Sequence, residues 1–131
     1  GGSNDLDVAN TVHVALLGED GEPLGWESTR PLPTPLWFHG AAFQGGRIYV
    51  WGGLTRKDRS YVNSHVYSAP FAYGRTQGEW RHEASMPHPV YSAGFIGAGG
   101  HLLCLGGRYA NSYPTNILWY CRLTNDGHAP A

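Results

Sequence analysis

The feature that most constrains this chain is an internal repeat. Residues 11–53 align with residues 65–107 at a shift of 54 positions, without a gap. The matched positions carry structural residue types: Val12 with Val66, Ala15 with Ala69, Trp26 with Trp80, Pro33 and Pro35 with Pro87 and Pro89, Gly40 with Gly94, Gly45-Gly46 with Gly99-Gly100, and Gly52-Gly53 with Gly106-Gly107. Such a repeat indicates one supersecondary unit per copy, stacked on its neighbours to bury a shared core.

A third, partial copy follows the second. Its matches to the first copy are Asn116 with Asn10, Leu118 with Val12, Cys121 with Ala15, Leu123 with Leu17, and Asp126-Gly127 with Asp20-Gly21. At the other end, Gly1-Gly2 stands where the double glycine of a preceding copy would stand. Because Gly1-Gly2-Ser3 is equally typical of an expression linker, the sequence leaves the origin of this segment open.

Each copy has the pattern of four short antiparallel strands, which we name a to d. Strand a (37–43 and 91–96) follows paired prolines, which disfavour helix. A double glycine then supplies the positive φ angles of a two-residue hairpin turn. Strand b (48–51 and 102–105) is apolar at four successive positions, so we expect both of its faces to be covered. Strand c is expected at 12–17, 66–71 and 118–123, and strand d around Trp26 and Trp80.

The composition agrees with this pattern. The chain has 19 Gly and 9 Pro, is 41% apolar and only 15% charged, which predicts a globular all-β protein of short strands and tight turns. Four antiparallel strands per copy, with both faces covered, form the blade of a β-propeller. Trp26 and Trp80 hold equivalent positions, so we expect them to pack between blades, with Trp51 in the core.

The ordered motif resembles the kelch repeat family, and specifically bacterial-type kelch repeats. The resemblance rests on Leu32-Pro33, the run Ile48 to Gly53 and Trp80, and on Leu102 to Gly107 in the second copy. It implies a kelch-like β-propeller of about five to eight blades, each of four antiparallel strands. The usual Arg-x-x-His after the proline is replaced by Leu36 to His39 in one copy and by Val90 to Ala93 in the other.

The chain holds about two blades, divided as a partial blade at 1–30, a full blade at 31–84 and a partial blade at 85–131. A closed ring therefore needs other chains or missing blades. We expect either the remaining blades of a longer protein or a homo-oligomer, in which three chains would give about six blades. In the trimer, strand c at 118–123 competes with residues 11–17 of the neighbour for one position, and the sequence does not decide between them.

The resemblance places ligands at the loops that follow the double glycine and at the entry to strand a. These segments are 54–62 and 108–115, with Trp37, Phe38, His39, Tyr91 and Ser92 at the strand entries. Aromatic rings beside Arg and Asn donors suit sugar rings or extended peptides. The candidate ligand-binding residues are Arg108, Tyr109, Asn111, Tyr113, Trp37, His39, Tyr91, Arg56 and Tyr61.

The leading hypothesis is a non-catalytic module that binds a carbohydrate or a protein. One alternative is a propeller enzyme of the sialic acid mutarotase or galactose oxidase type, although neither catalytic site maps onto residues here. Another alternative is a structural fragment of a larger propeller. The seven His show no short ligand spacing, so we predict neither a metal nor another cofactor.

The formal net charge of −1 provides no basic field for nucleic acid or anionic lipid, and we expect neither as a partner. The longest apolar run, residues 94–105, is interrupted by glycines and is too short to cross a bilayer, which takes about 20 residues. No secretory signal is visible, and the compartment stays open, with the resemblance favouring a secreted or cell-surface protein. Cys104 and Cys121 lie in neighbouring predicted strands and are either a disulfide or two buried thiols.

Overall fold

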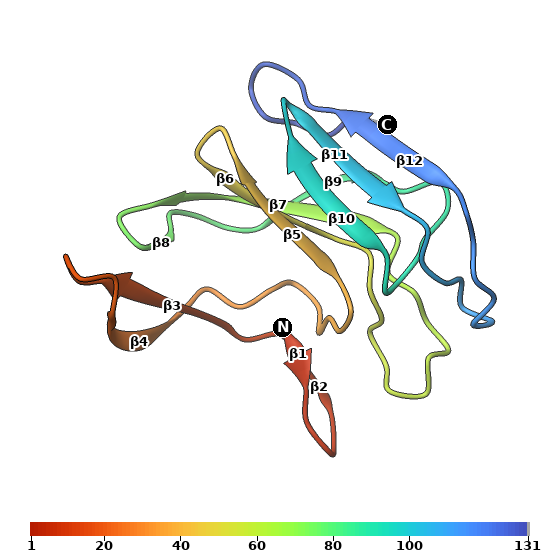
Figure 1. Cartoon of the computed structure of the whole chain (residues 1–131), viewed down its shortest axis with the longest axis horizontal. Coiled ribbons are helices and arrows are strands. Elements are labelled where there is room, and N and C mark those ends of the chain that lie inside the picture. The colour runs from red at the N-terminus through yellow and green to blue at the C-terminus, as the bar shows by residue number, and fades with distance from the viewer. Residues whose placement is uncertain (131) are drawn as a thin grey trace.

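The computed structural model describes residues 1–130 and folds them into short antiparallel strands joined by turns (Figure 1). The described strands form four sheets, and no helix is assigned among these residues. The described part of the chain accordingly contains no helical segment that is long and apolar enough to cross a membrane. The all-β prediction is confirmed.

The amino-terminal region holds two small sheets. A short hairpin pairs β1 (Gly2–Ser3) with β2 (Val8–Ala9). After it, β3 (Val12–Leu17) pairs with β4 (Pro23–Thr29), and these two strands are c and d of what we call the first blade.

The second blade has all four strands of the unit. The strands β5 (Gly40–Gln44), β6 (Arg47–Trp51) and β7 (His65–Ala72) pair in order. The other edge of β7 pairs with β8 (Arg75–Thr76) and with β9 (Arg81–Ser85). This a-b-c-d meander is the blade that the repeat predicts.

The third blade has three strands, β10 (Gly94–Ala98), β11 (His101–Leu105) and β12 (Leu118–Arg122), which pair in that order. The first strand of the β10–β11 hairpin, β10, lies beside β5 of the second blade (Figure 1). The double-glycine turn of this hairpin has φ angles of 55° and 74°, and the matching turn at Gly45 and Gly46 has 55° and 73°. Both turns have the conformation that the glycines predict.

Strand a begins three residues later than the sequence predicts in both copies. Trp37 and Tyr91 form isolated bridges with Leu54 and Arg108 instead of opening β5 and β10. The next residues, Phe38 and Ser92, have φ angles of 55° and 51°, which interrupt extended pairing. These two residues are one repeat apart, so the interruption belongs to the unit.

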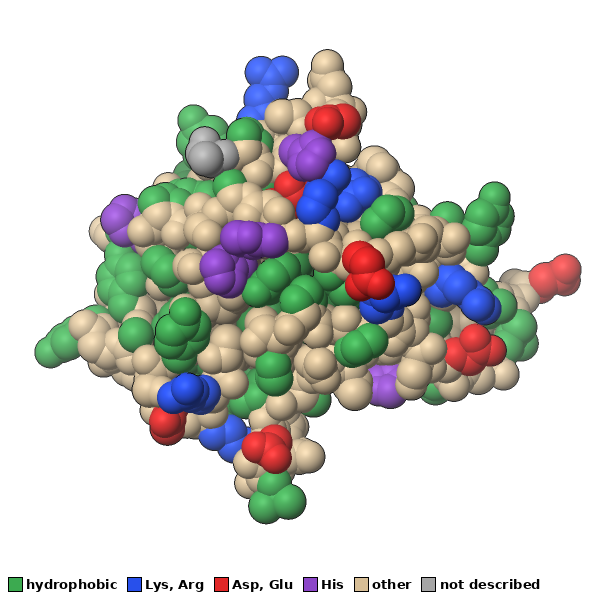
Figure 2. Space-filling view, turned by 180° about the vertical axis from the view of Figure 1, so that it is seen from behind, with side chains coloured by type: hydrophobic (Ala, Val, Ile, Leu, Met, Phe, Trp, Pro, Cys, Tyr) green, Lys and Arg blue, Asp and Glu red, His purple; other side chains and the backbone are tan. Residues whose placement is uncertain are grey.

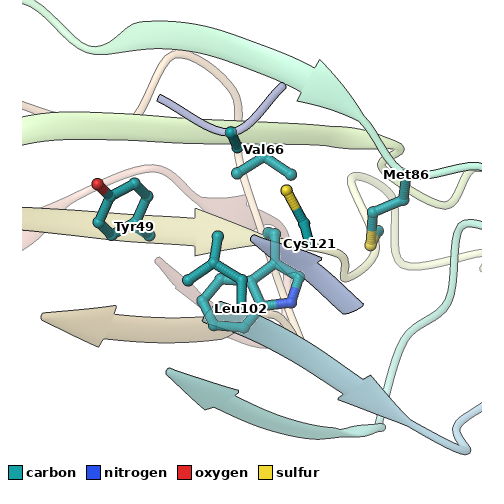
Figure 3. Close-up of a cluster of buried hydrophobic side chains, with 7 residues drawn as sticks. Tyr49, Val66, Met86, Leu102 and Cys121 are labelled. Atoms are coloured by element: carbon teal, nitrogen blue, oxygen red, sulfur yellow. The ribbon is translucent and has the colours of Figure 1, made fainter. Parts of the chain in front are cut away.

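The main core lies between the second and third blades. It joins Tyr49, Trp51, Val66 and Met86 to Leu102, Cys121 and Ala129 (Figure 3). Trp51 is fully buried and meets the ring of Phe95 edge-on, at 5.6 Å between ring centroids. The prediction that Trp51 lies in the core is confirmed.

A smaller core lies between the first and second blades. Leu32, Leu36 and Val50 are buried there, with Val12 and Trp80 packed against them. Trp80 thus packs between blades as predicted. Trp26 differs: its side chain is 71% exposed, and none of the described blades packs against it.

The two cysteines are buried free thiols, so the disulfide alternative is not realised. The pairing of β11 with β12 gives the reason. Cys104 stands opposite Trp119, and Cys121 stands opposite Leu102, so the thiols are diagonal on the sheet rather than directly paired. Diagonal positions on paired strands lie about 7–8 Å apart, with the Cβ atoms somewhat closer, which still exceeds the about 3.5–4.5 Å between Cβ atoms that a disulfide requires.

The amino-terminal double glycine behaves as part of the repeat. Gly2 donates its backbone N–H to the carbonyl of Leu36 at 2.8 Å, and Gly53 donates in the same way to Val90 at 3.0 Å. Because Leu36 and Val90 are one repeat apart, Gly2 takes the place of Gly53 in the preceding copy. The structure therefore favours the repeat origin of Gly1-Gly2 over an expression linker.

Candidate functional site

The candidate site is one end of the blades, which we call the loop face: residues 37–39, 54–62, 91–92 and 108–115. Its two long loops lie toward the lower side of the view, together with the β1–β2 hairpin (Figure 1). Both loops are anchored alike, since Leu54 bridges Trp37 and Val62 while Arg108 bridges Tyr91 and Pro114. The repeat thus fixes the two loops in equivalent positions.

The 108–115 loop is held closed by its own side chains. Arg108 donates from Nη1 to the carbonyl of Ser112 at 3.0 Å, and the Tyr109 hydroxyl donates to Thr115 Oγ1 at 3.1 Å. Asn111 Oδ1 accepts the backbone N–H of Tyr113 at 3.1 Å. The side chain of Tyr113 is 68% exposed. Of the four residues predicted here, Arg108, Tyr109 and Asn111 make hydrogen bonds within the loop, and the Tyr113 side chain extends into solvent.

Aromatic rings continue from this loop across the strand entries. Tyr91 is buried, and its hydroxyl lies 3.1 Å from Ser112 Oγ. Phe38 lies 6.4 Å from the Tyr91 ring and stacks on Trp37 at 4.5 Å, both measured between ring centroids. Phe38 is 44% exposed, whereas the predicted Tyr91 supports the loop from below.

The 54–62 loop has a fixed base and an open tip. At the base, buried Asn63 donates to the carbonyls of Gly52 and His65 and accepts the N–H of His65. Near the tip, Asp58 accepts hydrogen bonds from the N–H and the hydroxyl of Ser60, which lowers the pKa of its carboxyl. Tyr61 and Arg56 are exposed, as a binding role requires.

His39 is half-buried on the loop face. Its Nδ1 is buried without a hydrogen-bond partner. Burial and the nearby positive amino terminus lower the pKa of the imidazole to about 4, although a backbone hydrogen bond at Leu36 acts in the opposite direction and raises this pKa. His39 is therefore neutral near pH 7 and packs beneath Gly53, where an added Cβ would lie 2.7 Å from the His39 Cβ. Its predicted role in ligand binding stays a prediction.

Backbone strain gathers on the loop face. Phe38 and Ser92, together with Arg59 and Ser112 at the loop tips, have φ angles between 51° and 66°, which non-glycine residues rarely adopt. Such conformations persist where the surrounding contacts determine them, and they cluster at binding sites. The loop face is thus rigidly shaped while Phe38, Tyr61 and Tyr113 stay exposed. The sequence did not predict which loop side chains bond within their own loop and which stay exposed, because no sequence pattern reports the hydrogen-bond partner of a loop side chain.

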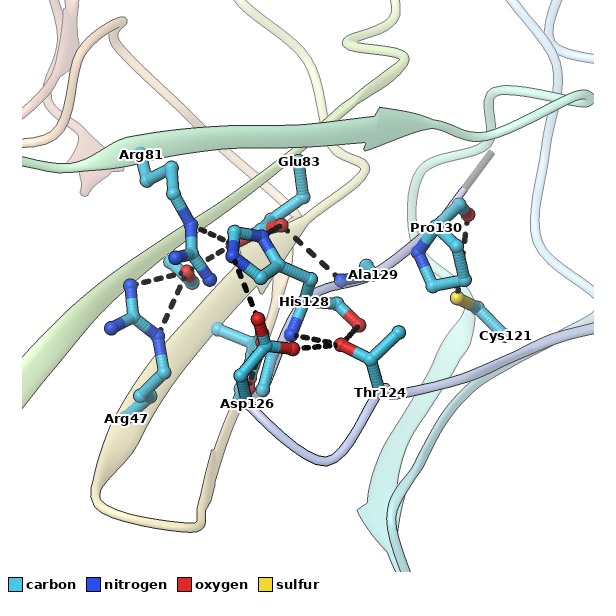
Figure 4. Close-up of polar contacts among 12 residues, drawn as sticks. Arg47, Arg81, Glu83, Cys121, Thr124, Asp126, His128, Ala129 and Pro130 are labelled. Carbon is cyan, nitrogen blue, oxygen red and sulfur yellow. Dashed lines mark hydrogen bonds and ion pairs between the residues drawn. The ribbon is translucent and has the colours of Figure 1, made fainter.

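The opposite side of the second blade holds a polar cluster that the sequence did not predict (Figure 4). The side chain of Glu83 is 2% exposed and accepts hydrogen bonds from Ser68 Oγ at 2.5 Å, Arg81 Nε at 2.7 Å and the N–H of Ala129 at 3.2 Å. His128 Nδ1 lies 3.1 Å from Glu83 Oε2, the same oxygen that accepts the N–H of Ala129. Burial alone would raise the pKa of Glu83, but these hydrogen bonds outweigh it and hold the pKa low.

All of these hydrogen-bond partners of Glu83 belong to the chain itself. Glu83 therefore holds the 124–130 segment against β9, and its carboxylate oxygens are already engaged. Among the described residues, no three His, Cys, Asp or Glu side chains gather in a way that could hold a metal ion. Figure 2 shows acidic and basic side chains scattered over the back of the molecule rather than collected in one patch.

Comparison with known proteins agrees with the repeat. No family model matches the chain. The chain is similar to a protein of Arabidopsis thaliana named as an F-box/kelch-repeat protein, with 29% identity over 112 residues, covering 83% of this chain and 32% of that protein. It is also similar to kelch repeat and BTB domain-containing protein 12 of Danio rerio, with 29% identity over 106 residues, covering 79% of this chain and 16% of that protein.

The chain thus spans about a third of the first relative and about a sixth of the second. In both, the matched protein carries kelch repeats by name, and the sheets seen here are the blades that such repeats form. The repeat and the stacked blades thus agree with the similarity of this chain to two kelch-repeat proteins.

Proposed function

We propose that this segment is a non-catalytic binding module whose loop face recognises a protein partner. The observation that carries the proposal is the exposure of Phe38, Tyr61 and Tyr113 at 44%, 56% and 68% on loops whose bases are hydrogen-bonded in place. Rigid aromatic side chains lose little entropy on binding and are enriched at protein interfaces.

The hydrogen-bond pattern favours a protein over a carbohydrate. A sugar needs fixed polar groups that orient its hydroxyls, and Arg108, Tyr109 and Asn111 were the predicted donors and acceptors. In the structure these three groups bond within their own loop. Phe38, Tyr61 and Tyr113 are the exposed aromatic side chains of this face, and the exposed side chain of Arg56 belongs to the same loop as Tyr61.

The test uses the chain as bait in an extract of its native source, with bound proteins identified by mass spectrometry. The triple variant Phe38→Ala/Tyr61→Ala/Tyr113→Ala should lose the specific partner. Tyr73→Ala is the matched control, because Tyr73 is 92% exposed on the turn between β7 and β8, away from the loop face. Equal capture by both variants would contradict the proposal, and glycan-array binding that the triple variant abolishes would replace protein by carbohydrate.

We also propose that the remaining blades belong to a longer protein, as the kelch-repeat relatives are longer than this chain. The trimer alternative requires β3 of a neighbour to enter the third blade. That position is already filled by β12, which pairs with β11 along its whole length and places Cys121 in the core. Light scattering should therefore find the 131-residue chain monomeric, whereas a stable trimer would contradict this proposal. The enzyme alternative stays a prediction that no observation favours.

A further inference from the structure

Two histidine side chains meet where β7 pairs with β9 in the second blade. His65 lies on β7 and His82 on β9, and their rings meet edge-on at 4.3 Å between ring centroids. His65 stands opposite Ser85 and Tyr67 stands opposite His82, so the four side chains share one face of the sheet. His82 is exposed and His65 is half-buried, which leaves the pair open to solvent.

The position of His65 is fixed by its neighbours. Its backbone N–H donates to Asn63 Oδ1 at 3.2 Å, and its carbonyl accepts from Asn63 Nδ2 at 2.9 Å. Its ring Nδ1 lies 3.2 Å from Ser85 Oγ. A metal-ligating histidine usually holds its second ring nitrogen in such a hydrogen bond, which orients the ring. The Nε2 of His65 is then the nitrogen that is left for a metal ion.

A buried aromatic ring supports the pair. The centroid of the Tyr67 ring lies 5.8 Å from that of His65 and 5.9 Å from that of His82. Burial raises the pKa of Tyr67, so its phenol stays protonated. Burial, followed by the charge of His82, lowers the pKa of His65, so this imidazole is neutral near pH 7. Metal ions bind the neutral form of imidazole, which is the form present here.

The spacing of the two rings suits one shared metal ion. A Zn–N bond is about 2.0–2.1 Å long, which puts the centroids of two imidazoles on one ion roughly 4.5–5.3 Å apart. The observed separation of 4.3 Å is slightly shorter. A small outward rotation of the exposed His82 side chain supplies the difference.

The repeat itself does not supply this pair. In the first copy, Thr11 holds the position of His65 and Ser28 holds that of His82. His13 stands opposite Ser28, with its Nδ1 3.3 Å from Ser28 Oγ. The first blade therefore has one imidazole beside a hydroxyl, as at His65, but Ser28 where the second blade has its second imidazole. Because His65 and His82 lie on different strands, a search for short ligand spacing does not find them.

We propose that His65 and His82 bind one divalent transition-metal ion, Zn²⁺ or a similar late first-row ion, which links β7 to β9. Imidazole ligands suit Zn²⁺, Cu²⁺ and Ni²⁺, whereas Mg²⁺ and Ca²⁺ prefer oxygen ligands. Water fills the remaining coordination positions, because the two imidazoles are the ligands that the chain supplies. Ser85 acts as a positioning residue that orients the His65 ring.

The test titrates Zn²⁺ into the 131-residue chain, without a histidine tag, near pH 7 and follows binding by calorimetry. One equivalent should bind, and His65→Asn and His82→Asn should each weaken binding by at least about tenfold. The double variant should lose little more than either single variant, since both ligands serve one ion. His13→Asn is the matched control and should leave the affinity unchanged. Ser85→Ala keeps both ligands and should weaken binding by about tenfold.

A second measurement uses the unaltered chain and so does not depend on the folding of a variant. In proton NMR, Zn²⁺ below one equivalent should shift the ring resonances of His65 and His82 before those of the other histidines. Mg²⁺ at the same concentration should leave them in place.

Three results would overturn the proposal. Unchanged affinity in His82→Asn would exclude the pair, and an equal loss in His13→Asn would show nonspecific binding to surface histidines. A first shift at His128, whose ring lies between the carboxylates of Glu83 and Asp126, would place the ion in the polar cluster instead. The loop-face variants leave both histidines in place, so failure here does not affect the protein-binding proposal.

Discussion

Two glycines at the same repeat position show how a neighbouring blade constrains a single residue. A Cβ built on Gly40 would lie 2.2 Å from Cγ of Phe95, which belongs to the third blade. A Cβ on Gly94 would meet only Leu105 of its paired strand, at 3.6 Å or more. Neither residue needs positive φ. Gly40 is therefore required by the contact between blades rather than by its own backbone.

Gly40→Ala should destabilise the chain by about 2 kcal/mol, the usual cost of overpacking a core. Gly94→Ala is the matched control and should change stability by less than about 0.5 kcal/mol, because its side chain enters open space. Urea unfolding of the two variants measures both values. Equal losses would mean that Phe95 does not pack over Gly40.

The buried imidazole of His39 makes stability depend on pH. Its folded-state pKa of about 4 lies below the ordinary value of 6.5, so between these values the unfolded chain binds a proton that the folded chain does not. Stability is unaffected above pH 6.5 and falls as pH drops toward 4. His65, whose pKa burial also lowers, adds to the same trend.

The His39→Gln variant has no titrating side chain at this position, so its free energy of unfolding should fall less between pH 6.5 and 4 than that of the unmodified chain. Urea unfolding at several pH values measures this difference. His88→Gln is the control, since His88 is exposed and its removal should leave the slope unchanged. A wild-type curve with no slope in this window, or one that His39→Gln leaves unchanged, would contradict the buried neutral imidazole.

At the scale of strands, the sequence predicts most of the pattern. Strand c at Val12–Leu17 matches its prediction, and both double-glycine turns form where expected. The late start of strand a was not predictable, because Phe38 and Ser92 carry no sequence mark of positive φ. The loop residues Arg108 and Asn111 were placed correctly but bond within their loop, and sequence alone cannot assign a donor's partner.

The register of β11 and β12 predicts the behaviour of the cysteines. Burial raises the pKa of Cys104 to about 11 and also raises that of Cys121, so both thiols are protonated and shielded near neutral pH. A thiol-specific reagent at pH 8 should leave the native chain unmodified and modify both residues in denaturant without a reductant. Absence of thiols in the unfolded, unreduced chain would show a disulfide and contradict the diagonal register.

At the scale of the whole molecule, the outer sheet face of the third blade is open among the described residues. Ile96, Leu105, Leu118 and Tyr120 of the third blade are 47% to 65% exposed on the side facing away from the second blade. The corresponding face of the second blade carries Tyr49 and Trp51 and is buried. An exposed apolar sheet face of this kind is expected of one blade within a longer row.

The central claim is that consecutive copies of the repeat stack as blades, with the third blade packed on the second. Proton NMR of the 131-residue chain tests it through the nuclear Overhauser contacts of the Phe95 ring. The account predicts contacts from this ring to the Gly40 α-protons and to the Trp51 indole, which lies 5.6 Å away between ring centroids. A folded chain in which the Phe95 ring shows contacts within its own sheet but none to Gly40 or Trp51 would contradict the stacking.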